Sequence, residues 1–149
     1  MTVGQVVRWN NFPHAKDRAA KPRFFIFVGK FSYGATNQNI YLYTTTTKSE
    51  YYEAGEIRDK HLTRSFGKGE FGFTEACILD IDLGWHIVQE HEIRNNPKIE
   101  TVGQLPERIS REIYELIWKS RSVPLAVKRD IYSSYNLAGI TGLRVPQRF

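Results

Sequence analysis

Basic side chains and hydroxyl side chains flank two neighbouring apolar segments of this chain. Lys21 and Arg23 stand at the beginning of the apolar run 23–28. Four threonines and then Lys48 follow the apolar run 40–43. If the two runs are antiparallel strands joined by a polar loop, the start of the first and the end of the second meet at one end of a sheet. We therefore expect cations and hydroxyls to gather in one patch there, although each also fits a solvated charge or a plain strand residue.

Two further side chains are candidates for acid–base chemistry. His14 lies in the polar loop before Lys21, and a histidine ring titrates near neutral pH. Asp80 ends the apolar run 77–80, and alternation along a strand places it on the same face as Asp82. Simpler interpretations stand beside these, because a loop histidine is often solvated and two carboxylates suit an exposed strand face.

The spacing of possible metal ligands does not indicate a metal site. His86 and His91 are five residues apart, so on a strand they point to opposite faces, and no run of ligands matches a zinc signature. Cys77 is the one cysteine, which excludes an internal disulfide or a four-thiolate site, and no catalytic base is evident beside it. We therefore expect neither a metal nor another cofactor.

Composition is that of an ordinary globular protein with a basic balance. The chain has 149 residues, with 41% hydrophobic and 25% charged residues and a formal net charge of +5. A basic protein favours a polyanionic partner, either nucleic acid or an acidic protein, although a merely solvated basic surface fits as well. The single cysteine, the lack of a signal-peptide pattern and the lack of a long apolar run predict a cytoplasmic protein without a membrane segment.

The order of the predicted elements indicates an α+β, strand-rich fold. Strands are expected at 4–10, 23–28, 40–46, 73–82, 85–93 and 98–102. A helix begins near Pro106 and carries an apolar stripe of Ile109, Ile113, Leu116 and Ile117. A shorter helix is expected at 124–135, and residues 49–72 form a long excursion with at most a short strand or helical turn.

This order predicts one domain over residues 1–149, built as a small antiparallel barrel with helices covering one side. The barrel is expected over about residues 3–102, the helical part over about 105–136, and a tail over 137–149, of which residues 143–149 are expected to be mobile.

Six short motifs occur along the chain in a recognisable order. They are Gly-Gln-Val-Val-Arg-Trp at 4–9, Asn-Phe-Pro at 11–13, Lys-Pro at 21–22, Ile-Tyr-Leu-Tyr-Thr-Thr-Thr-Thr-Lys at 40–48, Ala-Cys-Ile-Leu-Asp at 76–80, and Val-Gly-Gln-Leu-Pro-Glu-Arg-Ile at 102–109. In this order and spacing they resemble the MazF/PemK toxin family over roughly residues 3–118. The resemblance implies an SH3-like barrel with a terminal helix, a homodimer, metal-independent endoribonuclease cleavage of single-stranded RNA, and neutralisation by an acidic antitoxin protein.

Carried onto this chain, the resemblance implies a catalytic site built around Thr46, with Thr45 and Thr47 as neighbouring alternatives. Lys21 takes the place of the family's arginine, with Arg23 beside it. The remaining catalytic candidates are Asp80 and His14. The side chains expected to contact RNA are Lys16, Arg18, Tyr43, Thr45, Thr47 and Lys48.

Metal-independent RNA cleavage uses the 2′-hydroxyl as nucleophile and needs a base, an acid and a cation for the charge that grows on phosphorus. Ile78 stands where some members of the family carry an arginine. That substitution favours an alternative, in which the barrel is a catalytically inactive module that binds nucleic acid or an acidic protein segment.

Overall fold

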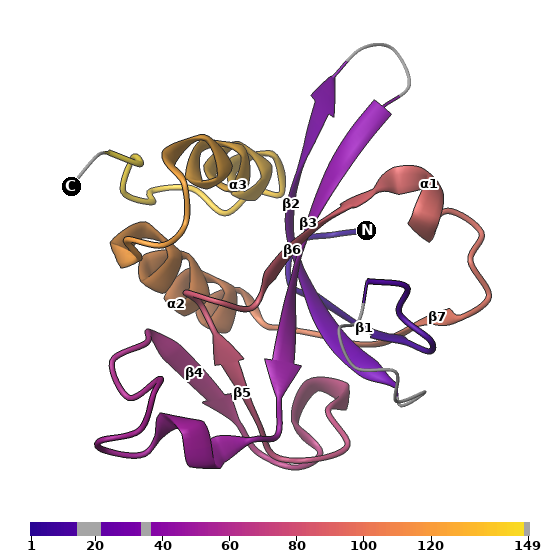
Figure 1. Cartoon of the computed structure of the whole chain (residues 1–149). Coiled ribbons are helices and arrows are strands. Elements are labelled where there is room, and N and C mark those ends of the chain that lie inside the picture. Colours follow the sequence, from indigo (N-terminus) through magenta and orange to yellow (C-terminus); the bar gives the residue numbers. More distant parts are fainter. Residues whose placement is uncertain (15–21, 34–36, 148–149) are drawn as a thin grey trace.

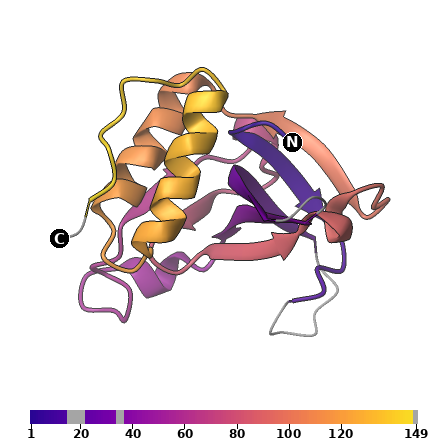
Figure 2. The ribbon, with the colours of Figure 1, turned by 90° about the horizontal axis from the view of Figure 1, so that it is seen from above.

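A curled antiparallel sheet forms most of the molecule, and two helices lie side by side against it (Figures 1 and 2). The structure is a computed structural model and describes residues 1–14, 22–33 and 37–147. The strands are β1 (Gln5–Trp9), β2 (Arg23–Tyr33), β3 (Asn37–Thr46), β4 (Thr63–Phe66), β5 (Cys77–Asp80), β6 (Trp85–Gln89) and β7 (Ile99–Gln104). The helices are α1 (Glu90–Ile93), α2 (Glu107–Lys119) and α3 (Leu125–Leu137), with short 3₁₀ turns η1 (Ser49–Tyr52) and η2 (Glu70–Gly72).

Strand β3 is the centre of the sheet. The strand order is β4-β5-β3-β2-β1-β7, and β6 also pairs with β3. The first part of β3 pairs with β6 and its end pairs with β5, so two short strands share one edge of β3. All pairings are antiparallel, which confirms the strand-rich α+β architecture expected for a small SH3-like barrel with C-terminal helices.

The hairpin of β2 and β3 is longer than its apolar residues indicate. Residues 29–33 and 37–39, of mixed character, continue the two strands, and Figure 1 shows this arm rising beyond the rest of the sheet. Backbone hydrogen bonds extend a hairpin without any need for apolar side chains, so hydropathy underestimates its length. Similarly, the strand expected at 85–93 ends at Gln89, and the next four residues form α1, whose first turn is closed by a capping box between Gln89 and Glu92.

Helices α2 and α3 bury one face each, as the apolar stripes predict. Ile109, Ile113 and Ile117 of α2 are each at most 1% exposed, and Ile131 and Tyr135 of α3 are buried as well. Helix α3 lies directly on β2, where a side-chain carbon at Gly29 would lie 3.2 Å from the Ile131 Cα atom. The absence of a side chain at Gly29 therefore allows this close contact.

The C-terminal segment lies along α2, and side chains of that helix bond to its backbone between Thr141 and Val145. The Tyr114 hydroxyl donates to the Arg144 carbonyl at 2.6 Å, and the Trp118 indole donates to the Val145 carbonyl at 3.0 Å. The Arg144 guanidinium lies 3.9 Å from the centre of the Trp118 ring and pairs with Glu115. Aromatic and charged side chains of α2 thus hold a segment whose own sequence has no regular structure.

Candidate functional site

The three strands expected to form the site are neighbours in the sheet. Phe25 lies opposite Thr44, so the start of β2 and the end of β3 meet at one end of the hairpin. Thr46 lies opposite Ile78 of β5, and Asp80 follows two residues later, about 7 Å along the strand. Arg23, Thr46 and Asp80 therefore stand on three successive strands of the sheet, β2, β3 and β5.

The basic residues expected to complete this patch lie in part outside the described residues. Lys16, Arg18 and Lys21 belong to residues 15–21, of which the structure gives no description. Arg23 is half-buried at the start of β2 and lies opposite Trp9. The cation expected before β2 is thus represented by Arg23.

The threonines at the end of β3 have local partners. The Thr46 hydroxyl accepts a hydrogen bond from the Lys48 backbone amide at 3.2 Å and so shapes the turn that leaves the strand. Thr45 is hydrogen-bonded to the Cys77 thiol, whose pKa is raised by burial against the opposing effect of that bond. Thr47 and Lys48 are exposed, and they remain available for a ligand.

Tyr43, which was expected to contact RNA, lies in the core of the protein. It is fully buried, and its hydroxyl donates to the Ile81 carbonyl at 2.9 Å. Its ring presents no face to solvent because the centre of β3 is covered on both sides. Tyr41, on the same strand face, donates to Asp130 of α3 at 2.6 Å, which shows that the helix layer covers this face.

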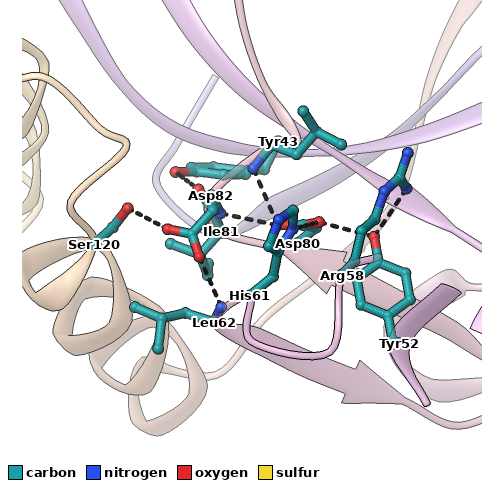
Figure 3. Close-up of polar contacts among 10 residues, drawn as sticks. Tyr43, Tyr52, Arg58, His61, Leu62, Asp80, Ile81, Asp82 and Ser120 are labelled. Carbon is teal, nitrogen blue, oxygen red and sulfur yellow. Dashed lines mark hydrogen bonds and ion pairs between the residues drawn. The ribbon is translucent and has the colours of Figure 1, made fainter. Parts of the chain in front are cut away.

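Both carboxylate oxygens of Asp80, at the end of β5, accept hydrogen bonds. It is 3% exposed and accepts four hydrogen bonds. One oxygen, Oδ1, accepts from the backbone amides of Asp82 at 2.9 Å and Leu83 at 3.0 Å. The other, Oδ2, accepts from the Tyr52 hydroxyl at 2.9 Å and from Nδ1 of His61 at 2.7 Å (Figure 3). The carboxylate therefore bonds both to the segment 49–72 that follows β3 and to the turn that directly follows β5.

His61 and Asp80 form an oriented imidazole–carboxylate pair. An ionised carboxylate only accepts hydrogen bonds, so Nδ1 of His61 carries the proton in this contact. When that ring is neutral its Nε2 is unprotonated, and the His61 side chain is 29% exposed. A buried carboxylate that fixes the tautomer of a partly exposed imidazole is the arrangement that a general base requires.

Arg58 supplies a cation beside this pair. Its guanidinium lies 5.1 Å from the centre of the Tyr51 ring and 5.8 Å from that of Tyr52, and it donates to the Tyr52 hydroxyl at 3.3 Å. Burial and the hydrogen bond to Asp80 raise the pKa of Tyr52, whereas Arg58 opposes the increase. Tyr52 is therefore protonated at neutral pH and donates a hydrogen bond to the Asp80 carboxylate. The cluster of Tyr52, Arg58, His61 and Asp80, here called the His61 cluster, combines a base, a cation and a hydroxyl.

Sequence reasoning missed His61 because residues 49–72 have no clear periodicity. The pairing of β4 with β5 places the two residues together: Thr63 lies opposite Asp80, and His61 precedes Thr63 by two residues. In an antiparallel pair the start of one strand meets the end of the other. Had β4 been predicted as the partner of β5, His61 would have been expected next to Asp80.

His14 belongs to a different cluster. Its Nε2 lies 2.7 Å from Oε1 of Glu92 in α1, and its side chain is 51% exposed. Burial acts against ionisation of Glu92, but the Gln89 amide and His14 together lower the pKa of this carboxyl. Two imidazole–carboxylate pairs of the described residues thus have the same N–O distance of 2.7 Å, and the expected site residue His14 is the more exposed of the two histidines.

Comparison of the chain with protein-family models, with curated proteins and with solved structures finds no match. Within the described residues, no three or more histidine, cysteine, aspartate or glutamate side chains are grouped to hold a metal ion. In the same part of the chain, no helix has both the length and the apolar character needed to cross a bilayer.

Proposed function

We propose that this protein is a metal-independent endoribonuclease that cleaves single-stranded RNA, with His61 as its acid–base catalyst. The observation that carries the proposal is the 2.7 Å contact between the buried carboxylate of Asp80 and Nδ1 of His61, beside the guanidinium of Arg58. RNA carries its own nucleophile, the 2′-hydroxyl, so its cleavage requires only a base, an acid and a cation. The His61 cluster offers these groups together.

In the proposed reaction, Nε2 of His61 takes the proton of the 2′-hydroxyl as the 2′-oxygen attacks phosphorus. The bond from phosphorus to the 5′-oxygen breaks, and the imidazolium returns its proton to that departing oxygen. The products are a 2′,3′-cyclic phosphate and a 5′-hydroxyl end. Arg58 stabilises the charge on the phosphoryl oxygens during the attack, and Asp80 stabilises the imidazolium.

Two further observations support an RNA substrate. The chain carries a formal net charge of +5, which favours a polyanion. Arg23, Thr47 and Lys48 lie where the start of β2 meets the end of β3. The end of β3 also pairs with β5, so an RNA strand bound by these residues would pass close to β5. In keeping with the resemblance to the MazF/PemK family, we propose that the activity is toxic to the cell that makes it and is neutralised by an acidic antitoxin.

A test compares the two imidazole–carboxylate pairs of the same chain. The purified protein is incubated with a labelled single-stranded RNA in excess EDTA, and the ends of the products are identified by mass spectrometry. We expect cyclic phosphate ends, no cleavage of the 2′-deoxy analogue, and a loss of about 10²- to 10⁴-fold in rate for His61→Ala. The matched variant His14→Ala, which removes the more exposed histidine, should retain the rate. Cleavage of the deoxy analogue, or loss of activity in His14→Ala alone, would contradict the proposal.

The second candidate, a binding module without catalysis, is favoured by Ile78. This side chain lies opposite Thr46 and is half-buried, so an apolar group occupies the position where the resemblance implies a cation. Binding of the same RNA without cleavage by the wild-type protein would support the module. Expression in a bacterial host adds a second measurement, because the nuclease should arrest growth and the module should not.

A further inference from the structure

Asp82 is hydrogen-bonded to the backbone of the residue after His61, whereas Asp80 is hydrogen-bonded to the His61 ring. The Asp82 Oδ2 atom accepts a hydrogen bond from the Leu62 amide at 2.8 Å. The Leu62 carbonyl in turn accepts from the Ile81 amide at 2.9 Å. Residue 62 is therefore fixed on both of its backbone polar groups, and His61 is its immediate neighbour (Figure 3).

The helical part of the chain fixes Asp82. Ser120, at the C-terminal end of α2, donates from its hydroxyl to Oδ1 of Asp82 at 2.5 Å. Ser120 is fully buried, and its carbonyl accepts from the ammonium of Lys128 in α3 at 2.5 Å. The same ammonium donates to the Trp118 carbonyl at 2.9 Å, so it satisfies two carbonyls at the end of α2. A continuous series of hydrogen bonds thus leads from α3 through α2 to the residue after His61.

We propose that Asp82 and Ser120 are positioning residues for His61, through which the C-terminal helices set the direction of the catalytic imidazole. This inference rests on the proposed function of His61. Asp80 alone determines which ring nitrogen carries the proton, but the ring can keep its 2.7 Å contact with Asp80 only while the backbone at residue 61 stays in place. Asp82 provides that restraint, and Ser120 prevents the Asp82 carboxylate from rotating away.

The experiment measures the tautomer of the His61 ring by NMR and, separately, the kinetics of RNA cleavage. Histidine is labelled with ¹⁵N, the His61 signals are assigned by their loss in His61→Ala, and the ring tautomer is read from long-range ¹H–¹⁵N spectra. We expect Ser120→Ala to convert the single Nδ1-protonated form of His61 into a mixture of tautomers and to lower kcat roughly 10- to 100-fold with little change in KM. The matched control is Ser134→Ala, because Ser134 is also a buried helix serine, bonded to the backbone of β2 away from the cluster.

A pair of substitutions at Asp82 keeps the test decisive if Ser120→Ala fails to fold. Asp82→Asn keeps an oxygen that can accept from the Leu62 amide, so it should preserve the tautomer of His61. Asp82→Ala removes both contacts and should give the mixture.

The results separate this inference from the proposed function. A tautomer that is unchanged in both Asp82→Ala and Ser120→Ala, or that changes equally in Ser134→Ala, overturns the positioning role whatever the rate of cleavage. A changed tautomer in a protein that cleaves no RNA supports the positioning role and removes the proposed function.

Discussion

Replacing Asp80 by asparagine changes the proton on His61 while keeping the shape of the side chain. The amide oxygen can still accept from the backbone amides of Asp82 and Leu83, as Oδ1 of Asp80 does. The amide nitrogen takes the place of Oδ2, which faces His61 and Tyr52. Because an amide nitrogen only donates, Nδ1 of His61 must become the acceptor and its proton must move to Nε2. The base proposed for the 2′-hydroxyl is then occupied.

The cost in stability is smaller than the cost in activity. The asparagine keeps the number of hydrogen bonds but replaces contacts to a charged group by weaker neutral ones. Since Tyr52 and His61 are partly exposed, we expect Asp80→Asn to lower the free energy of unfolding by about 1–2 kcal/mol, or Tm by roughly 2–8 °C. Asp80→Ala leaves four donors without their acceptor and should cost about 3–5 kcal/mol.

The rate of RNA cleavage should fall about 10²- to 10⁴-fold in Asp80→Asn, because the wrong tautomer of His61 dominates. The assay combines urea unfolding, initial cleavage rates in EDTA and the ¹⁵N tautomer spectrum of the same sample. Near wild-type cleavage by a folded Asp80→Asn variant with its proton on Nε2 would refute the reasoning. So would a folded variant that loses cleavage while its Nδ1 proton stays in place.

Three further predictions concern stability. Burial raises the pKa of Tyr43 and Tyr135, so above about pH 10 the unfolded chain loses tyrosine protons that the folded chain keeps. The free energy of unfolding should therefore fall as the pH rises beyond that value. Tm measured from pH 8 upward should show this decline, and a flat profile would contradict it. Gly103→Ala should cost at least about 1–3 kcal/mol in urea unfolding, because its added carbon would lie 2.0 Å from the Phe71 carbonyl oxygen, and an unchanged midpoint would show that this contact relaxes freely. Lys128→Met should cost about 2–3 kcal/mol, since two carbonyls at the end of α2 lose their shared donor, and a more stable variant would instead mean that burying the ammonium costs more than its bonds return.

The sequence predicted the helices better than the hairpin or the tail. The apolar stripe that includes Ile109 and Ile113 predicted the buried face of α2, because helical spacing alone places those residues together. The apolar run 40–43 predicted a strand, and all four side chains are buried because β3 lies at the centre of the sheet with α3 against it. The tail at 140–147 has no pattern of its own, and its place depends on Tyr114 and Trp118 of α2.

By itself the sequence determined the central strands and the helices α2 and α3, and that β2 and β3 bring Arg23 and Thr46 to one end of a hairpin. These features depend on local periodicity and on the short connection between the two strands. Only the tertiary structure decided that Asp80 meets His61, which is 19 residues away along the chain, and that Ser120 reaches Asp82 from another layer. The reason is that a buried carboxylate must be hydrogen-bonded, and its donors are the groups that tertiary packing places next to it. Those groups come from distant segments, so local sequence patterns do not predict them.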